Sequence, residues 1–189
     1  MPKLKIIGIA GTNGSGKDSL GQILADDYGW LFVSVADFLR EEAQKRGLPA
    51  EREVLREISA EWRRKHGLGV LIDRAVDLFE ESGGKYNGLA VSPMRNQGEA
   101  QRVKDLGGQL IWIDADPKVR YERVAGRGRD LESQKTYDEF LAAEEAETHS
   151  SGDAATLSLT NVKKIADIFL QNNGSLEEFK RTIQETLNL

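Results

Sequence analysis

The sequence contains no cysteine and only two histidines among its 189 residues. Without cysteine the chain forms no disulfide, no cysteine zinc site and no thiolate nucleophile, and two histidines are too few for a histidine metal cluster. Long hydrophobic runs are also missing, since the apolar run near the N-terminus is far shorter than a secretory or membrane-spanning segment. We therefore expect a cytoplasmic protein with no membrane partner.

Positive charge is in deficit as well, with 26 Lys and Arg against 31 Asp and Glu, a formal charge of −5. This balance has the wrong sign for a general nucleic-acid binder, so no nucleic-acid partner is expected and any anion site must be a local cluster of basic side chains. The length and the ordinary composition favour a single folded domain spanning residues 1–189.

A glycine-rich turn follows the first apolar run of the chain. Residues 6–10 are short, β-branched and bounded by glycine, as in a buried parallel strand, and Leu20, Ile23 and Leu24 then recur at helical spacing. The turn therefore lies between a strand and a helix N-terminus. In that position, backbone N–H groups and the helix dipole attract phosphate oxygens.

The spacing of this turn, Gly11-x-x-x-x-Gly16-Lys17, fits the Walker A pattern. In that pattern the glycines let the backbone wrap the phosphates and the lysine reaches the β and γ groups. We expect ATP to be bound by the residues of this stretch, which are Gly11, Thr12, Asn13, Gly14, Ser15, Gly16, Lys17, Asp18 and Ser19.

The residue after the lysine departs from the pattern, which calls for a Ser or Thr that binds Mg²⁺. Asp18 stands there, with Ser19 next. Two interpretations stay open: Asp18 is itself a hard oxygen ligand, or Ser19 takes the role by a shift of one residue. Asp114, at the end of a later apolar run, is a further candidate ligand for Mg²⁺.

Apolar runs of strand length recur at 30–35, 89–91, 110–114 and 165–170, with helical patterns between them. The alternation predicts an α/β fold of three αβα layers, the P-loop NTPase architecture, with a five-stranded parallel sheet and helices on both faces. Active sites in such sheets lie outside the carboxyl ends of the strands, where Asp37, Arg95 and Asp114 occur. Asp37 also suits the cap of a helix that begins at Phe38.

Arginines mark two of the predicted helices. In the helix over 51–65, four arginines fall away from the apolar face and are expected to be solvated: Arg52, Arg56, Arg63 and Arg64. In the helix that Pro117 opens, Arg123 and Arg127 form an i, i+4 pair whose side chains point the same way. Their mutual repulsion favours a phosphate between them, although a solvated basic helix end explains the pattern too.

Four stretches, 33–40, 95–100, 122–127 and 166–177, resemble the nucleoside monophosphate kinases, with dephospho-CoA kinases as close relatives. The resemblance implies a helical acceptor-binding region at about 37–85 and a short lid at about 126–136. It also implies that Arg40 and Arg95 bind the acceptor phosphate, with Gln97 beside them. Arg123 would pack on adenine, and Arg127 would contact the transferring phosphates.

One departure concerns the third strand, which in adenylate kinases ends in an aspartate that orders Mg²⁺. Here Val91 and Ser92 stand in its place. Metal binding would then depend on Asp18, Ser19, Asp37 or Asp114.

The sequence thus predicts an Mg²⁺-dependent phosphotransferase that moves the γ-phosphoryl of ATP to a small phosphorylated acceptor, such as a nucleoside or deoxynucleoside monophosphate or dephospho-CoA. Lys17, Arg95, Arg123 and Arg127 would supply positive charge, and Asp37 would be the general base for a hydroxyl acceptor. The alternative is a nucleotide-binding switch protein with slow or no hydrolysis. Either would be a monomer or a small homo-oligomer.

Overall fold

The computed structural model describes residues 5–128, 134–148 and 152–188. All strand pairs of its central sheet are parallel, in the order β2-β3-β1-β4-β5. The predicted five-stranded parallel sheet is therefore confirmed. The strands are β1 (Ile6–Gly11), β2 (Leu31–Ser34), β3 (Leu89–Ser92), β4 (Gln109–Asp114) and β5 (Ile168–Gln171).

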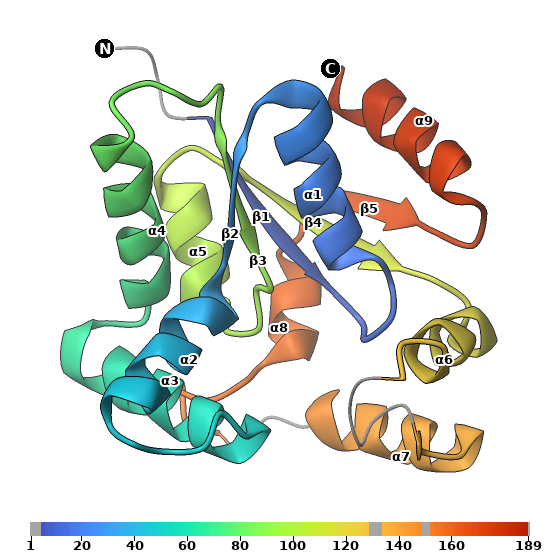
Figure 1. Ribbon diagram of the computed structural model, residues 1–189, viewed down its shortest axis with the longest axis horizontal. Coiled ribbons are helices and arrows are strands. Elements are labelled where there is room, and N and C mark those ends of the chain that lie inside the picture. The colour runs from blue at the N-terminus through green and yellow to red at the C-terminus, as the bar shows by residue number, and fades with distance from the viewer. Residues whose placement is uncertain (1–4, 129–133, 149–151, 189) are drawn as a thin grey trace.

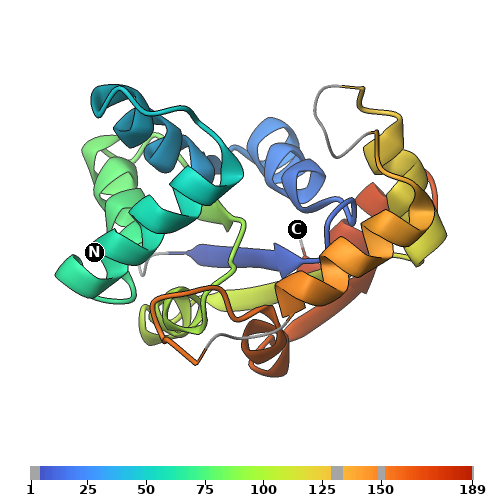
Figure 2. The ribbon, with the colours of Figure 1, turned by 90° about the horizontal axis from the view of Figure 1, so that it is seen from below.

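Helices cover both faces of the sheet, as predicted (Figures 1 and 2). Two of them lie on one face, α1 (Lys17–Tyr28) and α9 (Leu176–Leu187). The opposite face carries α4 (Val70–Glu81), α5 (Gln97–Asp105) and α8 (Leu159–Lys164). The remaining helices are α2 (Val35–Lys45), α3 (Arg52–His66), α6 (Pro117–Ala125) and α7 (Tyr137–Thr148).

Two hydrophobic cores, one on each face, explain why the first apolar run has no polar interruption. Ile7 and Ile9 of β1 pack into the core shared with α1 and α9. Ile6 and Ala10 belong to the core on the other face, to which α4, α5 and α8 also contribute. Because successive side chains of a strand alternate between faces, a strand covered on both sides needs apolar residues throughout.

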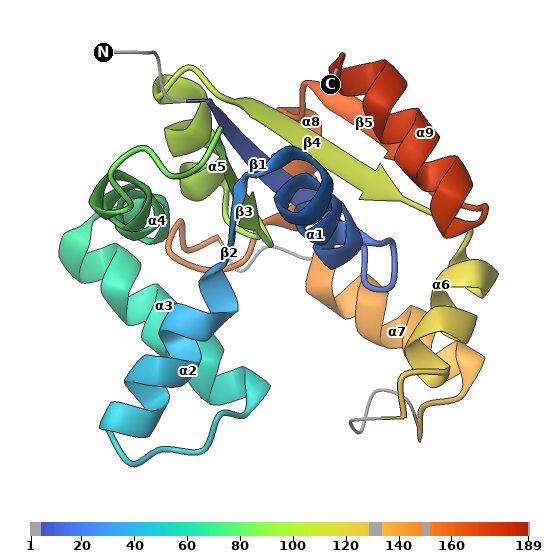
Figure 3. The same cartoon turned by 45° about the horizontal axis from the view of Figure 1, so that its top comes forward.

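Beyond the carboxyl ends of the strands, two helical groups face each other (Figures 1 and 3). Helices α2 and α3 lie on the β2 side, and α6 and α7 lie on the β4 side. None of the helices in the described ranges is long and apolar enough to cross a membrane. The region between these groups is where the candidate site lies.

Two local predictions need correction, and one short helix was not predicted. Helix α2 begins at Val35, which is buried, so Asp37 lies in the first turn of the helix and Ser34 is the N-cap. Strand β5 begins at Ile168 rather than at 165, and the short helix α8 before it was not predicted. Between α8 and β5, Asp167 is fixed to β4: its N–H donates to the Leu110 carbonyl, and its carboxylate accepts from the Leu110 N–H at 2.8 Å.

Candidate functional site

The loop between β1 and α1 has a backbone that only glycine permits at its tightest points. Gly11, Gly14 and Gly16 all have positive φ, at 146°, 77° and 102°. A Cβ on Gly11 would stand 2.0 Å from the Ile113 carbonyl oxygen, and one on Gly16 would stand 2.4 Å from Asn172 Nδ2. The loop is therefore wedged between β4 and the turn after β5, in the curled form that presents backbone N–H groups to phosphate.

Lys17 is the first residue of α1 and is only 9% exposed. Its ammonium group donates to the Thr12 carbonyl oxygen at 2.5 Å, and the Ser15 hydroxyl donates to the same carbonyl at 2.8 Å. The lysine thus folds back across the loop at the positive end of a helix. Glycine curvature, helix N-terminus and lysine together fit an ATP phosphate chain.

The candidate Mg²⁺ ligands differ in their surroundings. Asp18 and Ser19 are both exposed in the first turn of α1. Asp114 instead accepts a hydrogen bond from the Thr12 hydroxyl at 2.8 Å and lies within 4 Å of Arg120 Nε and Lys163 Nζ. Its charge is therefore balanced by neighbouring cations, whereas Asp18 and Ser19 are open to solvent at the start of α1.

A cavity of about 850 Å³ opens between the loop, α2, α3 and the segment after β3. It reaches Asn13 of the loop and has apolar walls that include Val35, Leu39 and Leu71. Basic side chains outnumber acidic ones in its lining. The basic residues are Arg40, Arg52, Arg56, Arg63, Arg95 and Lys135, against Glu51, Glu53 and Glu99. In a chain of net charge −5, this cavity is the local basic cluster that an anion site requires.

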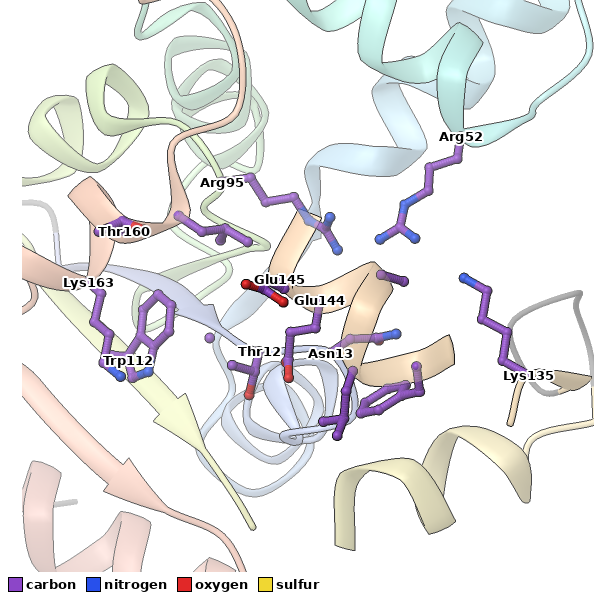
Figure 4. Close-up of a pocket in the computed structure, with 15 residues that line it drawn as sticks. Thr12, Asn13, Arg52, Arg95, Trp112, Lys135, Glu144, Glu145, Thr160 and Lys163 are labelled. Atoms are coloured by element: carbon purple, nitrogen blue, oxygen red, sulfur yellow. The ribbon is translucent and has the colours of Figure 1, made fainter. Parts of the chain in front are cut away.

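A second cavity, of about 520 Å³, lies on the α7 and α8 side of the same loop (Figure 4). Trp112 and Phe140 form apolar parts of its wall, and Glu144 and Glu145 of α7 contribute carboxylates. The two cavities share four lining residues, Asn13, Arg52, Arg95 and Lys135. These shared residues mark the place where the cavities adjoin.

Among the predicted acceptor residues, Arg40 and Arg95 both line the larger cavity. Gln97 begins α5 and is exposed, and it lines neither cavity. Asp37 lines neither cavity as well; its carboxylate is 70% exposed and binds Arg40 Nη1 at 2.6 Å. The general base expected for a hydroxyl acceptor is therefore directed at Arg40 in this structure.

The predicted lid arginines do not form a pair. Helix α6 ends at Ala125, so Arg127 lies beyond it and is exposed, which overturns the expected i, i+4 arrangement. Arg123 donates to the carbonyls of Asn172 and Gly174 at 2.8 and 3.2 Å. It therefore braces the turn after β5, next to the phosphate loop. Residues 129–133 of the predicted lid lie outside the described residues.

Several residues at the site carry no local sequence signal. Arg52 and Lys135 line both cavities but belong to no motif. Arg63 was expected to be solvated, which is wrong: it is 4% exposed and binds Glu99 Oε1 through Nη2 at 2.7 Å. Burial raises the pKa of Glu99 above its ordinary value, against the opposing attraction of Arg63. Only the folded structure brings these residues together.

Comparison with known proteins agrees with this architecture. A family model described as an AAA domain matches residues 7–149. A UPF0200 protein of Sulfurisphaera tokodaii is 31% identical over 188 residues, which cover 99% of this chain and 98% of that protein. The sequence similarity to this relative therefore extends over nearly the whole length of both chains.

Two solved structures share the fold at low sequence identity. The protein TT1252 from Thermus thermophilus superposes with a TM-score of 0.59 at 21% identity, covering 98% of this chain and 97% of that one. A shikimate kinase from Bacteroides thetaiotaomicron superposes with a TM-score of 0.54 at 14% identity, covering 98% and 99%. The fold is therefore that of P-loop kinases, and the chain belongs to the UPF0200 family and carries its P-loop within an AAA domain.

Proposed function

We propose that this protein transfers the γ-phosphoryl of ATP to a small phosphorylated acceptor, a nucleoside or deoxynucleoside monophosphate or dephospho-CoA. One observation carries the proposal: a cavity rich in arginine adjoins the phosphate loop at the carboxyl ends of the strands. A protein that only binds a nucleotide needs the loop, whereas a phosphotransferase also needs a second anion site next to it.

On the donor side, the loop amides and Lys17 would hold the β- and γ-phosphates. Arg123 would support the adenine end, because it fixes the turn at 172–174 beside the loop. Asp18 and Ser19 would bind Mg²⁺, which would supply charge neutralisation for the transferring phosphoryl group. Arg127, at the start of the predicted lid, would add positive charge near the transferring phosphoryl group.

On the acceptor side, Arg95 and a second cation of the larger cavity would bind a phosphate whose oxygen faces the γ-phosphorus. That oxygen forms the new P–O bond while the bond between the β–γ bridging oxygen and the γ-phosphorus breaks, and ADP leaves with the electron pair. A phosphate dianion is already nucleophilic and releases no proton, so no general base is needed. Asp37, which is held by Arg40, would matter only for a hydroxyl acceptor.

The alternative, a nucleotide-dependent switch, is favoured by one specific observation. Ser92 ends β3, where a metal-ordering aspartate stands in adenylate kinases, and its hydroxyl is buried without a hydrogen-bond partner among the described residues. The name of the shikimate kinase neighbour refers to phosphorylation of a small molecule, in agreement with transfer, but a likeness at 14% identity establishes the fold alone.

The deciding experiment is phosphoryl transfer from ATP to a panel of nucleoside monophosphates, deoxynucleoside monophosphates and dephospho-CoA. We expect turnover with at least one acceptor, reduced about 10²-fold to 10³-fold by Lys17→Met, as for the loss of one main charge-stabilising donor. Arg181→Ala, on the exposed face of α9, is the matched control and should retain full rate. Tight ATP binding with turnover of none of these acceptors would contradict the proposal and favour the switch.

A further inference from the structure

We infer that the acceptor's phosphate is bound where the two cavities adjoin, in a clamp formed by Arg52, Arg95 and Lys135. This inference deepens the proposed function and rests on it, because the bound phosphate belongs to an acceptor only if the protein is a phosphotransferase. Of the three residues, only Arg95 belongs to a recognisable motif. Arg52 and Lys135 are placed here by the fold alone, and the clamp assigns the role expected of Arg40 to Arg52.

The first support is the set of residues that the two cavities share. Three of the four shared residues are cations and none is an acid, although each cavity has carboxylates elsewhere in its lining. Positive charge is thus concentrated at the junction. A phosphate bound at this junction would be attracted by three cationic side chains at once, which favours the dianionic form.

The second support is the convergence of the three side chains from separate parts of the chain. Arg52 is the first residue of α3, Arg95 lies between β3 and α5, and Lys135 lies just before α7. In Figure 4 the charged ends of all three extend toward the same region, across from Asn13. An anion bound there would contact three elements that are far apart in sequence.

The third support is the end of helix α3. This helix has 15 residues, and residues 50–53 at its N-terminus line the larger cavity. The positive end of the helix dipole adds to the charge of the three side chains, and the carboxylates of Glu51 and Glu53, on either side of Arg52, oppose it. An arginine at this position offers two parallel N–H donors, the geometry that suits a phosphate.

The position of the clamp also suits transfer. Asn13 of the phosphate loop is the fourth residue shared by the cavities, so a phosphate in the clamp lies beside the loop that would hold the γ-phosphoryl. Arg40 is less suitable, because its side chain is 55% exposed and its guanidinium is bound to Asp37 at 2.6 Å. The organic part of the acceptor would then extend into the larger cavity, between α2 and α3.

The expected ligand group is a phosphate monoester or inorganic phosphate in its dianionic form. The test uses inorganic phosphate as the probe, titrated into protein already saturated with ADP so that the phosphate loop is occupied. Chemical-shift changes of backbone amides in ¹⁵N NMR spectra give the dissociation constant. We expect Arg52→Ala and Lys135→Ala each to raise it at least about fivefold, with partial recovery in Arg52→Lys, which keeps the charge.

Arg181→Ala is the matched control, since it removes the same kind of side chain from the exposed face of α9. A dissociation constant that stays within twofold in both Arg52→Ala and Lys135→Ala would overturn the clamp. The readout involves no turnover, so it separates the two proposals. Phosphate binding that depends on Arg52 in a protein without kinase activity would contradict only the function, whereas unchanged turnover kinetics in Arg52→Ala would contradict only the clamp.

Discussion

Arg63 and Glu99 form an ion pair that is almost completely buried, with side chains 3% and 1% exposed. Arg63 donates to Glu99 Oε1 through Nε at 2.9 Å and through Nη2 at 2.7 Å, and its Nη1 donates to the Ala155 carbonyl at 2.8 Å. The pair therefore joins α3, α5 and the segment before α8. Both residues line the larger cavity, so the pair also supports the shape of the proposed acceptor site.

Arg63→Met should be strongly destabilising. Removing the cation leaves Glu99 in a buried site without its partner, which typically costs about 3–5 kcal/mol in free energy of unfolding. The double variant Arg63→Met, Glu99→Leu should lose less than the single variant, because no uncompensated charge remains. Urea denaturation at pH 7 measures the free energy of unfolding of both variants. A single variant that is as stable as wild type would show that the ion pair contributes little to stability.

The deficit of Arg63→Met should also depend on pH. Burial already raises the pKa of Glu99 in the wild type, and loss of Arg63 removes the attraction that opposes this rise. For an acid whose folded pKa is raised, stability is fully present below the unfolded pKa and is lost as the pH rises through the folded pKa. The deficit of Arg63→Met relative to wild type should therefore grow from pH 4.5, the ordinary value for this carboxyl, toward neutrality.

The control for this pH dependence is Arg63→Met combined with Glu99→Gln, which cannot ionise at this position. Its deficit relative to wild type should change much less between acid and neutral pH than that of Arg63→Met. Unfolding free energies from urea titrations at several pH values provide the comparison. Equal pH dependence in the single and double variants would assign the effect to a group other than Glu99.

The sequence predicts those parts of this protein that local patterns determine. Strand β1, the glycine loop and Lys17 lie within a dozen residues of one another, and Ser175 and Glu178, three residues apart, form a capping box at the start of α9. The burial of Arg63 could not be predicted, because its partner Glu99 is 36 residues away. The same holds for the junction of the cavities, where three segments meet without any shared periodicity.

Asp18 tests the metal assignment at the phosphate loop. If it is a Mg²⁺ ligand, Asp18→Asn should raise the Mg²⁺ concentration for half-maximal turnover about tenfold, because a neutral amide binds a hard cation more weakly than a carboxylate. Asp26→Asn, at an exposed site two turns further along α1, is the matched control. Ser19→Ala tests the other candidate, and unchanged Mg²⁺ dependence in both Asp18→Asn and Ser19→Ala would exclude both ligands.

Arg123 links the turn after β5 to the phosphate loop through Asn172. The Asn172 carbonyl accepts from Arg123 at 2.8 Å, and the Asn172 side-chain amide donates to the Ser15 carbonyl at 2.8 Å. Arg123→Ala removes one end of this chain, in which each charge-assisted hydrogen bond is worth about 1.5–3 kcal/mol. If the turn holds the adenine end of ATP, the variant should raise the KM for ATP about tenfold or more.

The KM for the acceptor should stay within twofold in Arg123→Ala, because the clamp and the larger cavity do not include this residue. Steady-state kinetics with each substrate varied in turn separate the two constants, and Arg181→Ala again controls for the loss of an arginine. A change confined to the KM of the acceptor would contradict the prediction, because it would place Arg123 on the acceptor side of the site and not on the ATP side. Equal changes in both would instead indicate that the turn at 172–174 holds the phosphate loop in shape, since a distorted loop affects the γ-phosphoryl that both substrates share.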